Sequence, residues 1–452
     1  MSTTFSLWTM LRSRSSRGRD PQRLTEVLAV IAFATTTAVL LVVTGGFQAF
    51  WDRAGGADGI RAGLEVAETP YEVQYPFLAG IAVLLILVPL GTLGAAAARM
   101  AAARRDARLA ALRLCGATRS QVAGLTVLDA AAQALVGAVI GIAGYALLVP
   151  VVAQVRFQDR TFGLGELWVG IPVVLGAIVA VVVVAVLSAV ASLRRVAITP
   201  LGVANRVTPP GMRAVRVLAT VGAAAALVVA PQLTGGSIGI ALGVMVGLLL
   251  VTFATINLVG PFVIWVVGRT TAATARSVPT LLAGRRIADS PKSAWRSVGG
   301  VALAAFIAGL TATFSLLDPG DGTRPDEAAF IADLKTGGFL TLAIAGLLAA
   351  VSTGVMQAGR VIEQRDEHRA LVLAGTDHRT LDRARMRETL VPLAVSVGVA
   401  TVTVLMVMVP VVGLQPASDP GVLLQYLLCV AAASGLVLTG AAGSRAVART
   451  VA

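Results

Sequence analysis

Apolar residues in this chain fall into long, almost uninterrupted runs that are separated by short polar stretches. A run of about 20 apolar residues is long enough to cross the hydrocarbon core of a bilayer as an α-helix. The pattern therefore predicts an all-α polytopic membrane protein with about ten transmembrane helices, at residues 25–50, 76–100, 123–154, 168–193, 215–233, 237–268, 297–317, 337–358, 389–412 and 421–443.

The fifth and sixth runs admit two interpretations. The turn between them, Pro231–Gly236, is very short. They are either two full spans or a re-entrant pair, and we expect two spans. The segment before the first span contains an apolar stretch with a basic flank, Phe5–Arg12, which either lies in the membrane interface as a helix or forms a disordered tail.

Charge is distributed unevenly between the two ends of these spans. With the N-terminus in the cytoplasm, the external segments carry six basic and thirteen acidic side chains, and the rest of the chain carries 31 and 11. Basic residues of short loops stay on the cytoplasmic side. We therefore expect a multi-pass protein of the bacterial cell membrane with both termini in the cytoplasm. The net charge of +13 reflects this topology, and no nucleic acid is expected as a partner.

One basic segment occurs twice in the sequence. The first copy is RRDARLAALRLCGATRSQV, residues 104–122, and the second is EQRDEHRALVLAGTDHRTL, residues 363–381. Gly116 aligns with Gly375 at an offset of 259 residues, and each copy lies between two long apolar spans. A glycine after a basic helix favours a sharp helix end.

The match continues into the following span. Asp129 aligns with Glu388, and both are expected at the inner edge of the membrane, with Arg119 in reach of Asp129 and Arg383 or Arg385 in reach of Glu388. The small residues that follow favour close helix packing in lipid, namely Gly137 and Gly141 in the first copy and Ser396 and Ala400 in the second.

These repeats predict two parallel four-span units joined by a two-helix connector, because four spans plus two more restore the same orientation. The predicted parts are a cytoplasmic segment at 1–24, a first unit at 25–206, a connector at 207–270 and a second unit at 271–452.

Residue types that carry catalytic chemistry are scarce. The chain has two histidines and two cysteines, and their positions assemble neither a zinc site nor a catalytic triad. Its two lysines, Lys292 and Lys335, are not part of the Gly-Lys-Ser/Thr motif of a P-loop ATPase. We therefore expect no enzyme activity, no metal site and no cofactor in this chain.

The repeated segment resembles the cytoplasmic signature of the FtsX-like permeases of type VII ABC transporters. That signature reads roughly Arg-x-x-Glu-(apolar)-Ala-x-Leu-Arg-Ala-x-Gly-Ala-Thr-x-x-Gln, with an acidic residue early in the next span. The first copy supplies Leu112, Arg113, Gly116, Ala117, Thr118, Gln121 and Asp129, with Arg108 in the glutamate position. The second copy supplies Glu367, Leu371, Gly375 and Glu388, with Val372 and Thr376-Asp377 as departures.

The ten-span layout is similar to the bacitracin-resistance branch of that family, in which one chain holds both permease units. That branch carries a large extracytoplasmic domain between spans seven and eight, whereas this chain has only Asp318–Thr336. The resemblance implies a separately encoded ATPase that binds ATP and magnesium, with two copies docking beneath 101–122 and 360–385. The implied coupling residues are Arg108, Leu112, Arg113, Gly116, Ala117, Thr118, Glu367, Leu371, Leu373 and Gly375.

The spans themselves contain few polar side chains, chiefly Gln133, Asn257 and Gln357. A pathway for a charged solute usually places ionisable residues at mid-membrane. We therefore expect export or membrane clearance of a lipid or peptide, such as an antimicrobial, with membrane lipid as a partner. The alternatives are an ATPase-independent secondary carrier and a transmembrane signalling regulator. For the repeated loops, the alternative to coupling is simple anchoring to anionic lipid.

Overall fold

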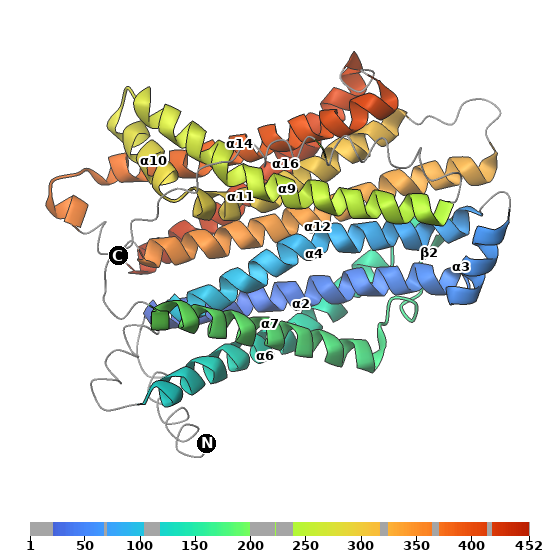
Figure 1. Cartoon of the computed structure of the whole chain (residues 1–452), viewed down its shortest axis with the longest axis horizontal. Helices are drawn as coiled ribbons and strands as arrows, with labels where there is room; N and C mark the ends of the chain where they lie inside the picture. The colour runs from blue at the N-terminus through green and yellow to red at the C-terminus, as the bar shows by residue number, and fades with distance from the viewer. Residues whose placement is uncertain are drawn as a thin grey trace.

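The computed structural model describes residues 21–66, 70–103, 118–198, 222, 238–316, 324–363, 370–413 and 418–451. Within these ranges the chain is helical apart from one short β-hairpin, and the long helices run roughly side by side (Figure 1).

In this described part, nine helices are long and apolar enough to cross a membrane. They are α2 (Pro21–Arg53), α4 (Tyr71–Ala103), α6 (Arg119–Val152), α7 (Gly170–Ile198), α9 (Ile238–Ala273), α11 (Pro291–Thr313), α12 (Pro325–Glu363), α14 (His378–Val412) and α16 (Pro420–Val451). The prediction of an all-α polytopic membrane protein is confirmed. Apart from Gly222, the predicted fifth span at 215–233 lies outside the described residues.

Two helices begin well before the apolar run that predicted them. Helix α12 begins at Pro325 and not at 337, and helix α14 begins at His378 and not at 389. Proline suits the first helical position. The acidic side chains of Asp326 and Glu327 in the first turn of α12 interact favourably with the positive end of the helix dipole. Polar first turns therefore extend both helices beyond the hydrocarbon core. The external segment predicted at 317–336 is consequently helical from Pro325 onward.

The short elements lie at opposite ends of the bundle (Figure 1). Helix α3 (Gly56–Glu65) and the antiparallel hairpin of β1 (Arg156–Phe157) and β2 (Arg160–Thr161) lie at one end, and helix α10 (Val278–Asp289) lies at the other. The 3-10 turn η2 (Phe314–Leu316) follows α11. We refer to the end of the bundle with α3 and the hairpin as the hairpin end, and to the end with α10 as the α10 end.

The long helices form two groups with the same arrangement. In the first group α2 packs against α4, α6 and α7, and in the second group α11 packs against α12, α14 and α16. Helix α4 also packs against α7, as α12 packs against α16. Helix α12 joins the groups by packing against α2 and α4.

Outside the two groups, α9 and α10 pack on α11 and α14. Helix α9, the later helix of the predicted connector, therefore packs mainly against helices of the second group. These contacts help to make α11 the most enclosed of the nine long helices described, with Val301, Ala304 and Ala305 fully buried.

Helices α2 and α6 approach closely at two glycines. A Cβ atom at Gly137 would lie 2.5 Å from the Cβ of Phe33, and one at Gly141 would lie 2.6 Å from the carbonyl oxygen of Ala34. In the second group, Ser396 and Ala400 are buried on α14, and Ala400 belongs to the core that α11 dominates. All four predicted packing residues thus lie at buried positions of the third helix of each group.

We predict that Gly141→Ala destabilises the protein, because its Cβ would press on backbone atoms of α2 that cannot rotate away. Overpacking of this kind costs about 1–3 kcal/mol. The thermal unfolding midpoint in detergent should therefore fall. Gly176→Ala on α7 is the matched control, since nothing lies within 4 Å of a Cβ there. An equal midpoint for the two variants would show that α2 and α6 do not pack as described.

Candidate coupling site

The repeated segment is described in part. Six of the ten predicted coupling residues lie outside the described residues, namely Arg108, Leu112, Arg113, Gly116, Ala117 and Glu367. The remaining four, Thr118, Leu371, Leu373 and Gly375, flank the starts of α6 and α14.

Gly375 ends the short helical turn before α14. Its φ angle is +88°, and its backbone N–H donates to the carbonyl of Val372 at 2.9 Å. The N–H of Thr376 donates to the carbonyl of Leu371 at 3.0 Å. These two bonds form a Schellman motif, in which glycine is favoured because a Cβ is strained at positive φ. The sharp helix end expected from the sequence is thus present in the second copy.

Thr118 and Asp377 occupy equivalent positions before the two membrane helices. Thr118 caps α6 by accepting from the N–H of Gln121 at 3.3 Å, and the Gln121 side chain accepts from the Thr118 N–H at 3.0 Å. This reciprocal pair is a capping box. Asp377 is the N-cap of α14. Helices α6 and α14 begin at Arg119 and His378, which are 259 residues apart, as are Gly116 and Gly375.

Leu373 is an exposed apolar residue of this turn. Its relative exposure is 82%, the highest among the large apolar side chains that are exposed in the described chain. Exposed leucines elsewhere lie mainly on membrane-facing helix surfaces, where lipid covers them. Leu373 lies instead in the segment between α12 and α14, so it is available for contact with a partner protein or the lipid interface.

Glu388 connects three helices at the α10 end. Its carboxylate lies 3.7 Å from Arg286 Nη1 on α10 and 3.7 Å from Arg360 Nη1 near the end of α12. Arg360 Nη2 also donates to the Ser293 hydroxyl on α11 at 3.0 Å. The three charged side chains are 12–20% exposed, so water screens them only in part.

Glu388 forms ion pairs with Arg286 and Arg360 on other helices, in addition to a Coulombic interaction with the expected Arg385 on its own helix. The sequence suggested Arg383 or Arg385, which lie on the same helix, whereas Arg286 and Arg360 come from helices that the chain folds against α14. Spacing along one helix cannot reveal such partners. The sequence contained one hint of a polar contact here, since Gln357 is a polar residue within a predicted span. In the structure Gln357 donates to Thr389, the residue after Glu388, at 3.0 Å.

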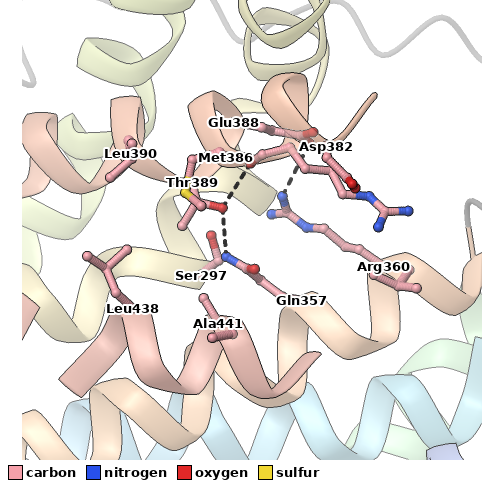
Figure 2. Close-up of a pocket in the computed structure, with 13 residues that line it drawn as sticks. Ser297, Gln357, Arg360, Asp382, Met386, Glu388, Thr389, Leu390, Leu438 and Ala441 are labelled. Atoms are coloured by element: carbon pink, nitrogen blue, oxygen red, sulfur yellow. Dashed lines mark hydrogen bonds and ion pairs between the residues drawn. The ribbon is translucent and has the colours of Figure 1, made fainter. Parts of the chain in front are cut away.

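This cluster opens on a cavity of about 430 Å³ between α12, α14 and α16 (Figure 2). Its lining includes Arg360, Arg385, Asp382 and Glu388, so positive and negative side chains are balanced. Asp129 lies half-buried on α6, ten residues after the start of its helix, as Glu388 does on α14. Among the described residues, no group of three or more histidine, cysteine or acidic side chains could hold a metal ion.

The fold defines a multi-pass membrane protein in which α6 and α14 begin at equivalent positions of a repeated sequence segment. Residues 96–201 match the family model of the FtsX-like permease C-terminal domain. The chain therefore carries an FtsX-like permease domain, and the family resemblance is confirmed. This domain is a component of ABC transporters that generally partners with an ABC ATPase and is not itself a catalytic enzyme family. Comparisons with curated proteins and with solved structures returned no match.

We predict that Glu388→Gln loosens α10 and the end of α12 from α14, because it removes one negative charge that both Arg286 and Arg360 contact. Loss of a partner for a largely buried charge costs about 1–3 kcal/mol. Amide hydrogen exchange in residues 278–289 should accelerate. Asp382→Asn is the control, since it removes the same charge from an exposed position of the same helix. Unchanged exchange in Glu388→Gln would mean that the ion pairs do not hold α10.

Proposed function

We propose that this chain is the permease subunit of an ABC transporter and that it couples ATP hydrolysis by a separate ATPase to export or membrane clearance of an amphipathic lipid or peptide. The observation that carries the proposal is the duplicated helix start. The N-caps of α6 and α14, Thr118 and Asp377, are 259 residues apart, the sequence repeats its glycine at the same offset, and the first copy lies in the matched permease domain. Two equivalent loops on one chain suit a partner that binds as two copies.

In this proposal the ATPase moves helices by pushing on the loop segments. Residues 364–377 join α12 to α14, and residues 104–118 join α4 to α6. Movement of the ATPase can be transmitted to the membrane helices only if the loop segments are rigidly connected to them. The Schellman turn at Gly375 and the capping box at Thr118 stiffen the loop ends, and Glu388 ties α14 to α12 and α10.

The substrate class follows from the chemistry of the spans. Side chains in the middle of the described helices are overwhelmingly apolar, and Asn257 is used internally as the acceptor for Trp295 at 3.1 Å. Such an interior offers little to a hydrated ion and suits an amphipathic compound. We place the protein in the bacterial cell membrane with its termini in the cytoplasm, so that the α10 end faces the ATPase. ATP and magnesium would be bound by the ATPase.

We predict that Gly116→Val combined with Gly375→Val abolishes stable ATPase association while the chain still inserts. At Gly375, whose φ is positive, valine costs about 1–2 kcal/mol and distorts the turn. Tagged chain should be purified gently from its native membrane, and the ATPase that accompanies it counted by quantitative mass spectrometry. We expect about two copies for the wild type and a loss of at least tenfold in the variant.

The matched control for this experiment is Gly170→Val combined with Gly413→Val. These glycines have positive φ, +78° and +75°, as Gly375 does, but flank α7 and α14 at the hairpin end. The control should keep its ATPase. Full ATPase recovery with the Gly116 and Gly375 variant would contradict the coupling site, and recovery of no ATPase with the wild type would favour a secondary carrier.

We also predict that Leu373→Asp weakens ATPase association several-fold, because it places a charge where an apolar side chain would be buried by the partner. Leu164→Asp is the control, since Leu164 is 61% exposed near the hairpin. Stimulation of ATP hydrolysis by the purified permease in nanodiscs measures the effect. If both variants stimulate equally, Leu373 does not contact the ATPase.

A further inference from the structure

The two helix groups leave a cavity of about 210 Å³ between them. Residues from α2, α4, α11 and α12 line it, together with Phe157 and Phe162 of the hairpin segment. Its lining is apolar except for a few groups, and one of these, Asp333 on α12, is a carboxylate. The sequence had placed Asp333 in an external loop, and only the early start of α12 brings it to this cavity.

Aromatic rings form much of the wall at the hairpin end. Phe50 on α2 stacks on Tyr75 of α4 with ring centres 5.5 Å apart. It also meets the edges of Phe157 and Phe162 at 5.3 and 5.4 Å. Aromatic faces carry negative electrostatic potential and attract cations.

Asp333 is held by two neutral donors. The Tyr75 hydroxyl donates to Oδ2 of Asp333 at 2.6 Å, and the backbone N–H of Gln158 donates to the same oxygen at 2.7 Å. The ion pairs found among the described residues do not include Asp333. Glu72 and Asp159 add further negative charge around Tyr75. The carboxylate therefore has no counter-charge from the described protein.

A nearby cation, Arg53, is already neutralised. Its guanidinium lies 4.3 Å from the centre of the Phe162 ring, but Glu166 accepts from it at 2.7 Å. The carbonyls of Phe157 and Thr161 accept further hydrogen bonds from Arg53. Arg53 thus fastens the hairpin to α2 and leaves Asp333 as the unbalanced charge of the cavity.

We propose that this cavity binds a hydrophobic ligand that carries one cationic group, with Asp333 as its counter-ion. The apolar wall holds the body of the ligand, and the aromatic rings and the carboxylate select a positive charge over a neutral or negative one. The proposal rests on the proposed function in taking this ligand as the transported compound. Binding itself requires no ATPase, so the two proposals can fail separately.

The cavity is also placed to respond to movement. Asp333 belongs to the second helix group, whereas Tyr75 belongs to the first and Gln158 lies in the hairpin that connects α6 to α7. A displacement of α12 relative to α4 would break these bonds and open the cavity. Ligand binding in the cavity would then depend on the position of α12, the helix that leads into the loop at residues 364–377.

The test uses radiolabelled tetraphenylphosphonium and the full chain in phosphatidylcholine nanodiscs, with empty nanodiscs subtracted. Asp333→Asn should weaken binding at least tenfold, equivalent to about 1.4 kcal/mol. Asparagine is nearly isosteric and its oxygen still accepts from Tyr75 and Gln158, so the fold is preserved. Asp326→Asn is the matched control, because Asp326 is exposed in the first turn of the same helix. It should bind like the wild type.

Tetraphenylborate is the second control, since it has nearly the same shape and the opposite charge. It should fail to displace tetraphenylphosphonium from the wild type. Equal affinity in wild type and Asp333→Asn, an equal loss in Asp326→Asn, or displacement by tetraphenylborate would each overturn the proposal. ATPase co-purification from the same wild-type preparation reports on the proposed function independently.

Discussion

Close backbone contact between helices is the constraint on which this structure depends. Lipid tails are as apolar as the side chains they would replace, so apolar burial alone does not drive helices together in a bilayer. Contact must come from packing, and it is closest where one helix offers a glycine. Gly141 meets α2, Gly300 meets Ala349 on α12, and Gly440 meets the carbonyl of Ala350. These contacts hold each helix group together and set where the remaining side chains meet.

Polar interactions then concentrate at the two ends of the packed helices. Glu388 joins α10, α12 and α14 at one end, and Asp333 joins α12 to α4 and the hairpin at the other. Helix α12 takes part in both clusters and also packs between the two groups. A rigid rod of this kind can carry a displacement from a loop at one end to a cavity near the other. That connection is the physical basis for the proposed transport role.

The fold could be predicted in outline because the bilayer imposes strong rules. Apolar run length predicted every long helix that the structure describes, and the repeated segment predicted equivalent glycines, Gly116 and Gly375, before α6 and α14. Helix starts were less predictable, because polar turns at Pro325 and His378 carry no apolar signal. The candidate site was predictable only where the chain repeats a local motif, as at Gly375, whose Schellman turn depends on neighbouring residues alone.

By itself, the sequence determined the membrane class, the family resemblance and the repeated loops, since these follow from local composition and short motifs. Only the tertiary structure decided the partners of Glu388 and the place of Asp333. Arg286 lies about a hundred residues before Glu388, and Tyr75 lies 258 residues before Asp333. Contacts over such separations depend on which helix faces pack together, and periodicity along one helix does not specify the neighbour that it will meet.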